Sequence, residues 1–390
     1  MLLTGSGRLA PLRLSPWGLL VVDGRIAWVG APADAPRSDA ERVDLGSALV
    51  TPGLVDSHTH PVFAGDRADE AAARLEGAPY SGGGILRTVA ATREADDATL
   101  ERLVEDRLRA ALAAGTTTVE CKSGYGLSLD AELRHLRLIG RVAERVPMRV
   151  VRTLLAAHAL PPEASSMSDY AAHVADEIVP AAAAEGVAEF VDVFCDEGFF
   201  DLAAAERIGL AARAAGLGLR LHADQLADTG AAALGARLGA ASVDHLEQLD
   251  DAGIRAIAES TTVATVLPGP ALVLRSRLPP ARALIDAGAT VALASDANAG
   301  TFQNFGAMPL VVGLGATVLG MTVTEALTAA TAGAAAALGL SDETGALREG
   351  VAADIVAWDA EQEGAFALSL GAVRPHRVWI GGREVALPAA

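Results

Sequence analysis

The sequence predicts an α/β protein, a (β/α)8 TIM-type barrel with a small β-sandwich domain built from both termini. Three observations predict this fold. Eight strand-like apolar runs in the middle of the chain alternate with alanine-rich helical stretches. Hairpin-like segments occupy both ends of the chain. Six of the eight apolar runs end in His, Asp, Lys or Glu, as expected where barrel strands converge on an active-site face.

Both chain ends carry the signals of β hairpins. Near the N-terminus, residues 18–22 and 25–30 are apolar and flank Asp23-Gly24, a dipeptide typical of two-residue hairpin turns. Near the C-terminus, residues 377–380 and 383–385 flank Gly381-Gly382. We therefore expect residues 1–50 plus 346–390 to form one small β-sandwich domain.

The middle of the chain, residues 51–345, is expected to form the barrel. Helical stretches such as 98–115 and 202–216 each end in glycine, and alternating strands and helices imply a parallel sheet. An open doubly wound sheet is the alternative, but no glycine-rich dinucleotide fingerprint follows the first strand. The expected strands cover residues 53–60, 116–124, 149–158, 189–198, 218–225, 241–248, 261–269 and 290–298.

Composition excludes several classes of function. The chain has 390 residues, of which 51% are hydrophobic, and its formal net charge is -18. This acidic balance argues against binding to nucleic acid or to an anionic membrane. Two cysteines cannot build a disulfide framework. With no apolar run long enough to cross a membrane and no targeting segment, a cytoplasmic protein is expected.

Four strand-end residues have the side chains of a metal site. His58 and His60 are two residues apart on one strand, so both can point into the barrel. With His222 and Asp296 they offer three imidazoles and one carboxylate, which suits Zn²⁺ or another borderline divalent ion and leaves a position for water. A lone strand-end histidine is more often a satisfied core group, but several together make coincidence a poor explanation. We expect His135, His173 and His376 to lie on the surface.

Several segments of the chain resemble known proteins. The run PGLVDSHTH, the strand-end residues His222, His245 and Asp296, and the tail GALREGVAADIVAWD are similar to the amidohydrolase superfamily. HTHPVFAGDRADE, GGGILRTVAATREA, TTTVECKSGYGL, LLAAHALPPE and LHADQL narrow the resemblance to the imidazolonepropionase family within it. KSGYGL and AGDRADE are the most specific of these segments.

The resemblance implies an activity and a set of site residues. The family hydrolyses the cyclic amide C–N bond of 4-imidazolone-5-propanoate, giving N-formimidoyl-L-glutamate in histidine degradation, with one zinc or iron ion, and it suggests a homodimer. The metal ligands would be His58, His60, His222 and Asp296. The substrate-binding residues would be Arg67, Tyr125, His158, Asn298, Gly300 and Thr301. We also expect Gln225 to bind the substrate, through a hydrogen bond to its ring.

The expected chemistry fits these residues. A metal ion can lower the pKa of bound water to about 7 and so supply hydroxide. Asp296 can accept the proton of that water and pass it to the departing nitrogen. His245 can donate a hydrogen bond to the carbonyl oxygen. Arg67 can bind the propionate bidentately, although a surface arginine paired with Asp66 or Asp69 is an equally good interpretation of the residue alone.

The sequence departs from the family pattern at three positions. Ser57 stands where Cys is frequent, and Ala299 replaces a proline that would stiffen the loop at Gly300. Gln225 occupies a position where some relatives have Glu, and it cannot take a proton at neutral pH.

Lys122, the only lysine of the chain, has two interpretations. Some amidohydrolases carry a carboxylated lysine that bridges two metals, but on a later strand. We therefore expect a buried pair of Lys122 with Glu120 or another barrel carboxylate, and a single metal. Cys121 is expected to face the helices, and Cys195 to lie in the core.

Two other functions stay open at this point. One is a single-metal amidohydrolase that deaminates a purine or related heterocycle, which would share the metal set without needing a carboxylate clamp. The other is a non-catalytic, metal-free barrel that acts as a binding protein, which the full ligand set disfavours.

Overall fold

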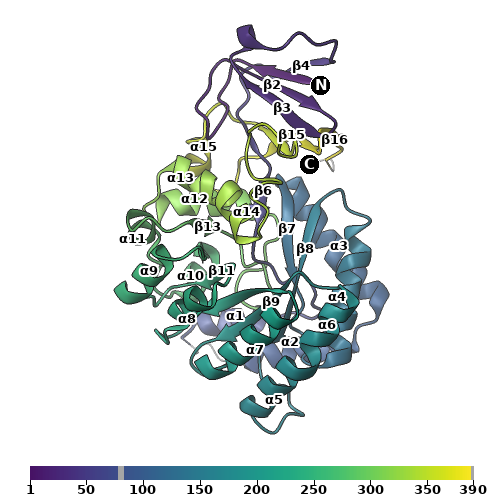
Figure 1. Cartoon of the computed structure of the whole chain (residues 1–390), viewed down its shortest axis with the longest axis vertical. Helices are drawn as coiled ribbons and strands as arrows, with labels where there is room; N and C mark the ends of the chain where they lie inside the picture. Colours follow the sequence, from purple (N-terminus) through teal and green to yellow (C-terminus); the bar gives the residue numbers. More distant parts are fainter. Residues whose placement is uncertain (78–82, 388–390) are drawn as a thin grey trace.

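The computed structural model describes residues 1–77 and 83–387, which form an eight-stranded parallel sheet and two four-stranded sheets (Figure 1). The parallel sheet and its helices make up the larger body, and the strands from both chain ends gather at one end of it. The predicted fold class, a (β/α)8 barrel with a small β domain from both termini, is confirmed. Among the described residues, no helix combines the length and apolar character needed to cross a membrane.

All eight predicted barrel strands form, in chain order around the sheet. The barrel closes between the first and last strands just beyond their regular ends. The backbone N–H of His60 donates to the carbonyl of Ala297 at 2.9 Å, and the N–H of Asp296 donates to the carbonyl of His58 at 3.0 Å. Three of the four residues in these two hydrogen bonds are therefore also predicted metal ligands. The strands are β6 (Leu54–Asp56), β7 (Thr116–Lys122), β8 (Arg149–Ala157), β9 (Phe190–Cys195), β10 (Gly218–Ala223), β11 (Ser242–His245), β12 (Val263–Val266) and β13 (Val291–Leu293).

Side-chain caps and glycines mark the ends of the helices. Asp96 and Asp201 accept hydrogen bonds from the first turns of α3 and α7, which satisfies backbone donors that a helix leaves unpaired. The helices are α1 (Ala68–Leu75), α2 (Gly83–Glu94), α3 (Asp97–Ala113), α4 (Leu129–Ala143), α5 (Met167–His173), α6 (Val179–Glu185), α7 (Leu202–Ala214), α8 (Ala231–Leu238), α9 (Asp251–Ala258), α10 (Pro268–Leu274), α11 (Ala281–Asp286), α12 (Met308–Thr317), α13 (Val323–Thr328), α14 (Ala334–Ala337) and α15 (Ala365–Leu368). Short π-helical turns join α5 to α6 and α13 to α14, and a 3-10 turn covers Pro32–Asp34.

The strands of the chain ends form two sheets with a shared core. One sheet has the order β3-β2-β1-β4 and the other β16-β15-β14-β5. Buried residues from both ends pack together, among them Leu3, Trp17, Val351 and Trp379. The strands are β1 (Leu2–Gly5), β2 (Trp17–Val22), β3 (Arg25–Gly30), β4 (Arg42–Asp44), β5 (Val50–Pro52), β14 (Ile355–Trp358), β15 (Pro375–Ile380) and β16 (Arg383–Val385).

Both predicted hairpins are present. Asp23 and Gly24 have φ values of 48° and 77°, and Gly381 and Gly382 have φ values of 54° and 71°, which is the left-handed pair that a tight hairpin turn requires. The carbonyl of Gly24 accepts a hydrogen bond from the backbone N–H of Ala353, so the N-terminal hairpin is tied to the C-terminal segment. The domain boundaries at 50/51 and 345/346 stay a prediction.

One surface prediction is wrong. His135 lies in α4 with no exposed surface, on the same buried face as Glu132, Leu136 and Ile139. Burial lowers the pKa of His135, so its imidazole is neutral in the core. His173 is only partly buried at the end of α5, and His376 is exposed on β15.

Trp379 offers a test of the core shared by the two termini. It is 1% exposed, so Trp379→Ala should cost about 3–5 kcal/mol through lost apolar burial and the cavity left behind. We expect a lower thermal midpoint in calorimetry. Leu368→Ala is the matched control, because Leu368 is 87% exposed; equal midpoints for the two variants would contradict a core at this position.

Candidate metal and substrate site

One pocket collects most of the predicted site residues at the carboxyl ends of the barrel strands. Two predicted residues, His58 and Gly300, are not part of its lining. Ile85 and Phe194 line it without having been predicted. The predicted residues in the lining are His60, Arg67, Tyr125, His158, His222, Gln225, His245, Asp296, Asn298 and Thr301.

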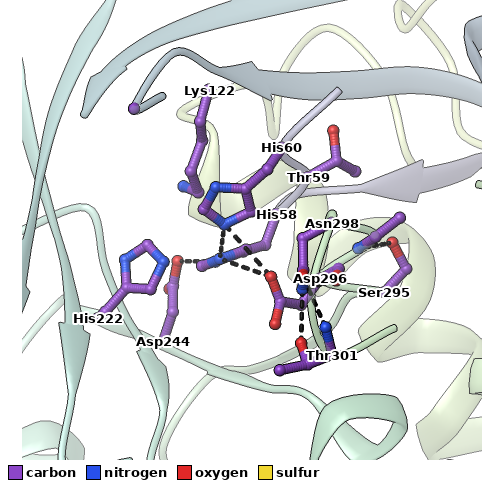
Figure 2. Close-up of polar contacts among 12 residues, drawn as sticks. His58, Thr59, His60, Lys122, His222, Asp244, Ser295, Asp296, Asn298 and Thr301 are labelled. Carbon is purple, nitrogen blue, oxygen red and sulfur yellow. Dashed lines mark hydrogen bonds and ion pairs between the residues drawn. The ribbon is translucent and has the colours of Figure 1, made fainter. Parts of the chain in front are cut away.

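Three of the four predicted ligand groups meet at distances that suit one metal ion. Nε2 of His58 lies 3.2 Å from Nε2 of His60 and 3.5 Å from Oδ1 of Asp296. Nε2 of His60 lies 3.3 Å from the same Oδ1, and Figure 2 shows the three groups turned toward one another. A tetrahedral ion with bonds of about 2.0–2.1 Å would hold neighbouring ligand atoms roughly 3.3–3.4 Å apart.

His222 completes this set. One nitrogen from each of His58, His60 and His222 lies within 4.8 Å of the others. Nε2 of His222 is buried, and no hydrogen-bond partner for it exists in the described part of the chain. A buried imidazole nitrogen without a partner is costly unless it binds something, so the donor set fits a divalent metal.

The protonation states also suit metal binding. Burial is the main cause that lowers the pKa of His58 well below its usual value and that of His60 to about 4. Burial acts to raise the pKa of Asp296, but the hydrogen bond and charge of His60 outweigh it, and the pKa falls. His58 and His60 are thus neutral imidazoles beside the ionised carboxylate of Asp296, which are the forms that bind metals.

Two buried carboxylates fix the orientation of the histidines. Nδ1 of His58 lies 2.7 Å from Oδ2 of Asp244, and Nδ1 of His222 lies 3.1 Å from Asp192. Contacts of this kind direct the other ring nitrogen toward the metal. Sequence reasoning missed both aspartates, although each lies on a predicted barrel strand. Asp244 also accepts a hydrogen bond from the fully buried Arg220.

Lys122 is held between two carboxylates. Its Nζ lies 2.7 Å from Oε1 of Glu120 and 2.8 Å from Oδ2 of Asp192, and all three side chains are fully buried. Burial acts to lower the pKa of Lys122, but the charges of Asp192 and Glu120 outweigh it, so the pKa is raised. The predicted buried pair is therefore present, and an ammonium in this position is a poor substrate for carboxylation.

Left-handed backbone conformations occur where barrel strands end. Asp224 has a φ of 51°, His245 of 84°, Leu246 of 73° and Asp296 of 48°. Each such conformation costs on the order of 1–3 kcal/mol for a residue other than glycine and persists only where surrounding contacts impose it. This strain turns the chain sharply after β10, β11 and β13, next to the residues that line the pocket.

His245 is paired with a carboxylate that the sequence analysis did not single out. Nδ1 of His245 lies 3.4 Å from Oε1 of Glu247, and both residues are about 1% exposed. Burial acts to lower the pKa of His245, but Glu247 outweighs it and raises the pKa. His245 is thus well suited to donate a hydrogen bond into the pocket.

Arg67 is a buried residue rather than a surface one. It is 5% exposed, and its Nε and Nη2 donate to the two oxygens of Glu70 at 2.8 and 2.7 Å. The expected surface partners are engaged elsewhere: Asp66 accepts from the backbone of Ala68, and Asp69 pairs with Arg87. Arg67 therefore lies at the pocket with its guanidinium oriented by Glu70.

The loop after β13 is held by one amide side chain. Nδ2 of Asn298 donates to the carbonyl of Asp296 and to Oγ1 of Thr301. Its Oδ1 accepts from the backbone N–H groups of Gly300 and Thr301. Asn298 and Thr301 line the pocket, but these polar atoms bind the loop itself. The loop at Ala299 is thus braced without the proline that relatives carry.

Tyr125 and His158 lie beside His60, one of the predicted metal ligands, in the lining of the pocket. The rings of His60 and His158 stack with centroids 5.3 Å apart, and Tyr125 lies 5.2 Å from His158. Nδ1 of His158 contacts the carbonyl of Gly124 at 2.8 Å. The loop that carries Tyr125 is tied down by Glu132, whose carboxylate accepts from the backbone N–H groups of Gly124, Gly126 and Leu127.

Gln225 lines the pocket from the loop after β10. Asp196 fixes its backbone, since Oδ2 of Asp196 accepts from the N–H groups of Gln225 and Leu226. The position of Gln225 thus depends on a carboxylate from the neighbouring strand end.

Comparison with known sequences places the chain in a family. The model of the Amidohydrolase family matches residues 49–385. A curated imidazolonepropionase from Ralstonia nicotianae is 47% identical, over 90% of this chain and 88% of the relative. Another from Pseudomonas putida is 45% identical, over 93% of this chain and 92% of the relative, and one from Vibrio cholerae is 43% identical.

Solved structures share the fold at lower identity. A 5-methylcytosine deaminase from Klebsiella pneumoniae has a TM-score of 0.80 at 17% identity, covering 100% of this chain and 99% of that one. An adenosine deaminase from Xanthomonas campestris with bound zinc has a TM-score of 0.73 at 22% identity, covering 98% and 92%. At this identity the likeness concerns the fold alone, whereas the sequence relatives show the family. The chain belongs to the amidohydrolase family and, within it, to the imidazolonepropionases.

Proposed function

We propose that this protein hydrolyses 4-imidazolone-5-propanoate to N-formimidoyl-L-glutamate, a step of histidine degradation. Water adds to the ring carbonyl carbon, the amide C–N bond breaks, and the released ring nitrogen takes up a proton. The observation that carries the proposal is that one pocket is lined by imidazoles and a carboxylate suited to a metal and also by Arg67. Relatives at 43–47% identity that are named imidazolonepropionase support it.

The metal site would be formed by His58, His60, His222 and Asp296, and we propose one Zn²⁺ or Fe²⁺ ion there. When bound, such an ion supplies a nucleophile at neutral pH by lowering the pKa of water to about 7. We also propose a cytoplasmic homodimer, by analogy with the family.

Asp296 is the proposed proton carrier. As an ionised carboxylate beside the imidazole cluster, it can accept the proton of the attacking water. It can then deliver that proton to the ring nitrogen as the C–N bond breaks. A single positioned side chain would thus act first as a general base and then as a general acid.

His245 is the proposed stabiliser of the carbonyl oxygen. Negative charge grows on this oxygen when water adds, and a donor already aimed at it lowers the barrier. Glu247 favours the protonated form of His245. In this scheme Gln225, Tyr125 and His158 bind the ring, Arg67 binds the propionate, and Asn298, Gly300 and Thr301 shape the pocket wall beside them.

A direct assay tests the proposed function. Purified protein is mixed with freshly generated imidazolone propionate, and the ultraviolet absorbance of the ring is followed. We expect loss of the ring, formation of N-formimidoyl-L-glutamate, abolition by a chelator and recovery on adding Zn²⁺ or Fe²⁺. Release of ammonia from a purine or pyrimidine, with the imidazolone left intact, would instead identify a deaminase.

Removal of one metal ligand should remove metal and activity together. His58→Ala deletes the imidazole at the centre of the cluster, so we expect neither stoichiometric metal in elemental analysis nor measurable turnover. His376→Ala, which changes an exposed histidine of β15, is the matched control and should retain both. Full metal content in His58→Ala would refute the ligand assignment, and two metals per parent chain would refute a mononuclear site.

Gln225 should matter less than the two proposed catalytic residues. Gln225→Ala removes a neutral hydrogen bond and should cost about 1 kcal/mol in kcat/KM. Asp296→Asn and His245→Ala should lower kcat by about 10²–10⁴-fold, with metal content measured for each variant. If Gln225→Ala is as damaging as Asp296→Asn, or if Gln225→Glu is much faster than the parent, this division of roles is wrong.

A further inference from the structure

The guanidinium of Arg67 is fixed by a carboxylate on the next turn of the chain. Arg67 immediately precedes α1, and Glu70 lies in the first turn of that helix. Glu70 takes the Nε–Nη2 edge of the fork in a bidentate contact. The Nη1–Nη2 edge is the other edge that a carboxylate can engage bidentately. Because Glu70 fixes the guanidinium, it also fixes the direction in which the Nη1–Nη2 edge of Arg67 points.

Two glycines make room for this guanidinium. A Cβ atom at Gly84, in α2, would lie 2.1 Å from Nη2 of Arg67 and 2.2 Å from Oε2 of Glu70. A Cβ atom at Gly300 would lie 2.2 Å from Nη1 of Arg67. Neither glycine has a positive φ, so backbone conformation does not require glycine at either position. Because the guanidinium approaches both so closely, a methyl group at either position would have to displace it.

A second arginine also contacts Glu70. Nη1 of Arg74 donates to Oε1 of Glu70, and Nη2 of Arg74 donates to the carbonyl of Gly300, both at 2.6 Å. Two guanidinium groups thus share one carboxylate. Burial acts to raise the pKa of Glu70, but Arg67 and Arg74 outweigh it and lower the pKa, so Glu70 stays ionised.

We propose that Glu70 and Gly84 are positioning residues that, with Gly300, form a seat for the Arg67 guanidinium and thereby make the pocket selective for a ligand with a carboxylate. The inference deepens the proposed function and rests on it, since it assigns the substrate's propionate to Arg67. Glu70 acts as an anchor for the arginine and not as a competitor of the substrate.

The test compares two stable imidazoles that differ in the carboxylate. Imidazole-4-propionate and 4-methylimidazole are titrated by calorimetry into the metal-loaded protein. For the parent we expect tighter binding of imidazole-4-propionate. Glu70→Gln and Gly84→Ala should reduce that preference on the order of tenfold or more, because a charge-assisted contact is lost or misdirected. The affinity for 4-methylimidazole should stay unchanged.

Steady-state kinetics add a measurement that a purely structural role of Glu70 and Gly84 would not change, namely the effect on KM relative to the effect on kcat. Both variants should raise KM for imidazolone propionate more than they lower kcat. Arg67→Lys keeps the charge but loses the fork, so we expect the same pattern. Combining Arg67→Lys with Glu70→Gln should cost little more than Arg67→Lys alone, because residues that act as one unit are not additive.

Matched controls separate the seat from general damage. Asp69→Asn removes a carboxylate next to Glu70 that pairs with the exposed Arg87, and Gly140→Ala adds a methyl group to α4 at an ordinary 3.5 Å from its nearest neighbour, Arg152. Both should keep the parent's preference. Gly84→Ala meets the ends of two side chains, so we expect it to displace the Arg67 guanidinium with at most a small drop in the thermal midpoint.

The outcomes distinguish the seat from the reaction. If the parent hydrolyses imidazolone propionate but Glu70→Gln and Gly84→Ala retain its ligand preference, the seat is wrong and the proposed function stands. If the parent prefers imidazole-4-propionate but shows no turnover, and both variants lose that preference, the proposed function is wrong and the seat stands. A parent without any preference for imidazole-4-propionate, or tighter binding by Glu70→Gln, overturns the seat.

Discussion

Compensation of buried charge is the constraint on which the rest of the site depends. Four of the buried carboxylates in the barrel interior, from Glu120, Asp192, Asp244 and Asp296, lie near two buried cationic side chains, Lys122 and Arg220. Unpaired buried charge is expensive, and two negative charges in this set have no side-chain cation to match them. A single divalent ion held by the histidines and Asp296 would supply positive charge to this set. The same electrostatic requirement thus explains why the histidines point inward and why the interior tolerates so many acids.

The prediction succeeded wherever a local pattern carried the information. Strand periodicity and the convergence of strand ends sufficed to group His58, His60, His222 and Asp296, because their placement follows from where each strand stops. The contacts of Asp192 and Asp244 with the histidines were not predicted, because their partners lie on other strands. Which residues meet between strands depends on the register of the sheet, and the sequence alone does not determine that register. The surface prediction for His135 is wrong for a different reason. Its spacing from Glu132 and Ile139 places it on the buried face of α4, whereas the prediction treats a histidine within a helical pattern as exposed.

Barrel closure and metal binding share the same residues. The parallel bridge between Thr59 and Ala297 closes the barrel, and each of these residues lies next to proposed ligands. Ser295 adds a second link, since its hydroxyl donates to Asp56 at 2.6 Å. Burial raises the pKa of Asp56 to about 7 despite that hydrogen bond. The link between the first and last strands is therefore only partly ionised at neutral pH, and it adds less negative charge than an ordinary aspartate would.

The loop after β13 shows how a departure from the family pattern is accommodated. Proline at position 299 would stabilise the fold mainly by restricting the unfolded chain, whereas the native shape of the loop is imposed by Asn298, which bonds at both its nitrogen and its oxygen. Arg74 adds a contact from α1 to the carbonyl of Gly300. Since these contacts fix the loop in the folded state, alanine at 299 changes the entropy of the unfolded chain more than the geometry around Asp296. The loss of the proline is thus compatible with an intact site.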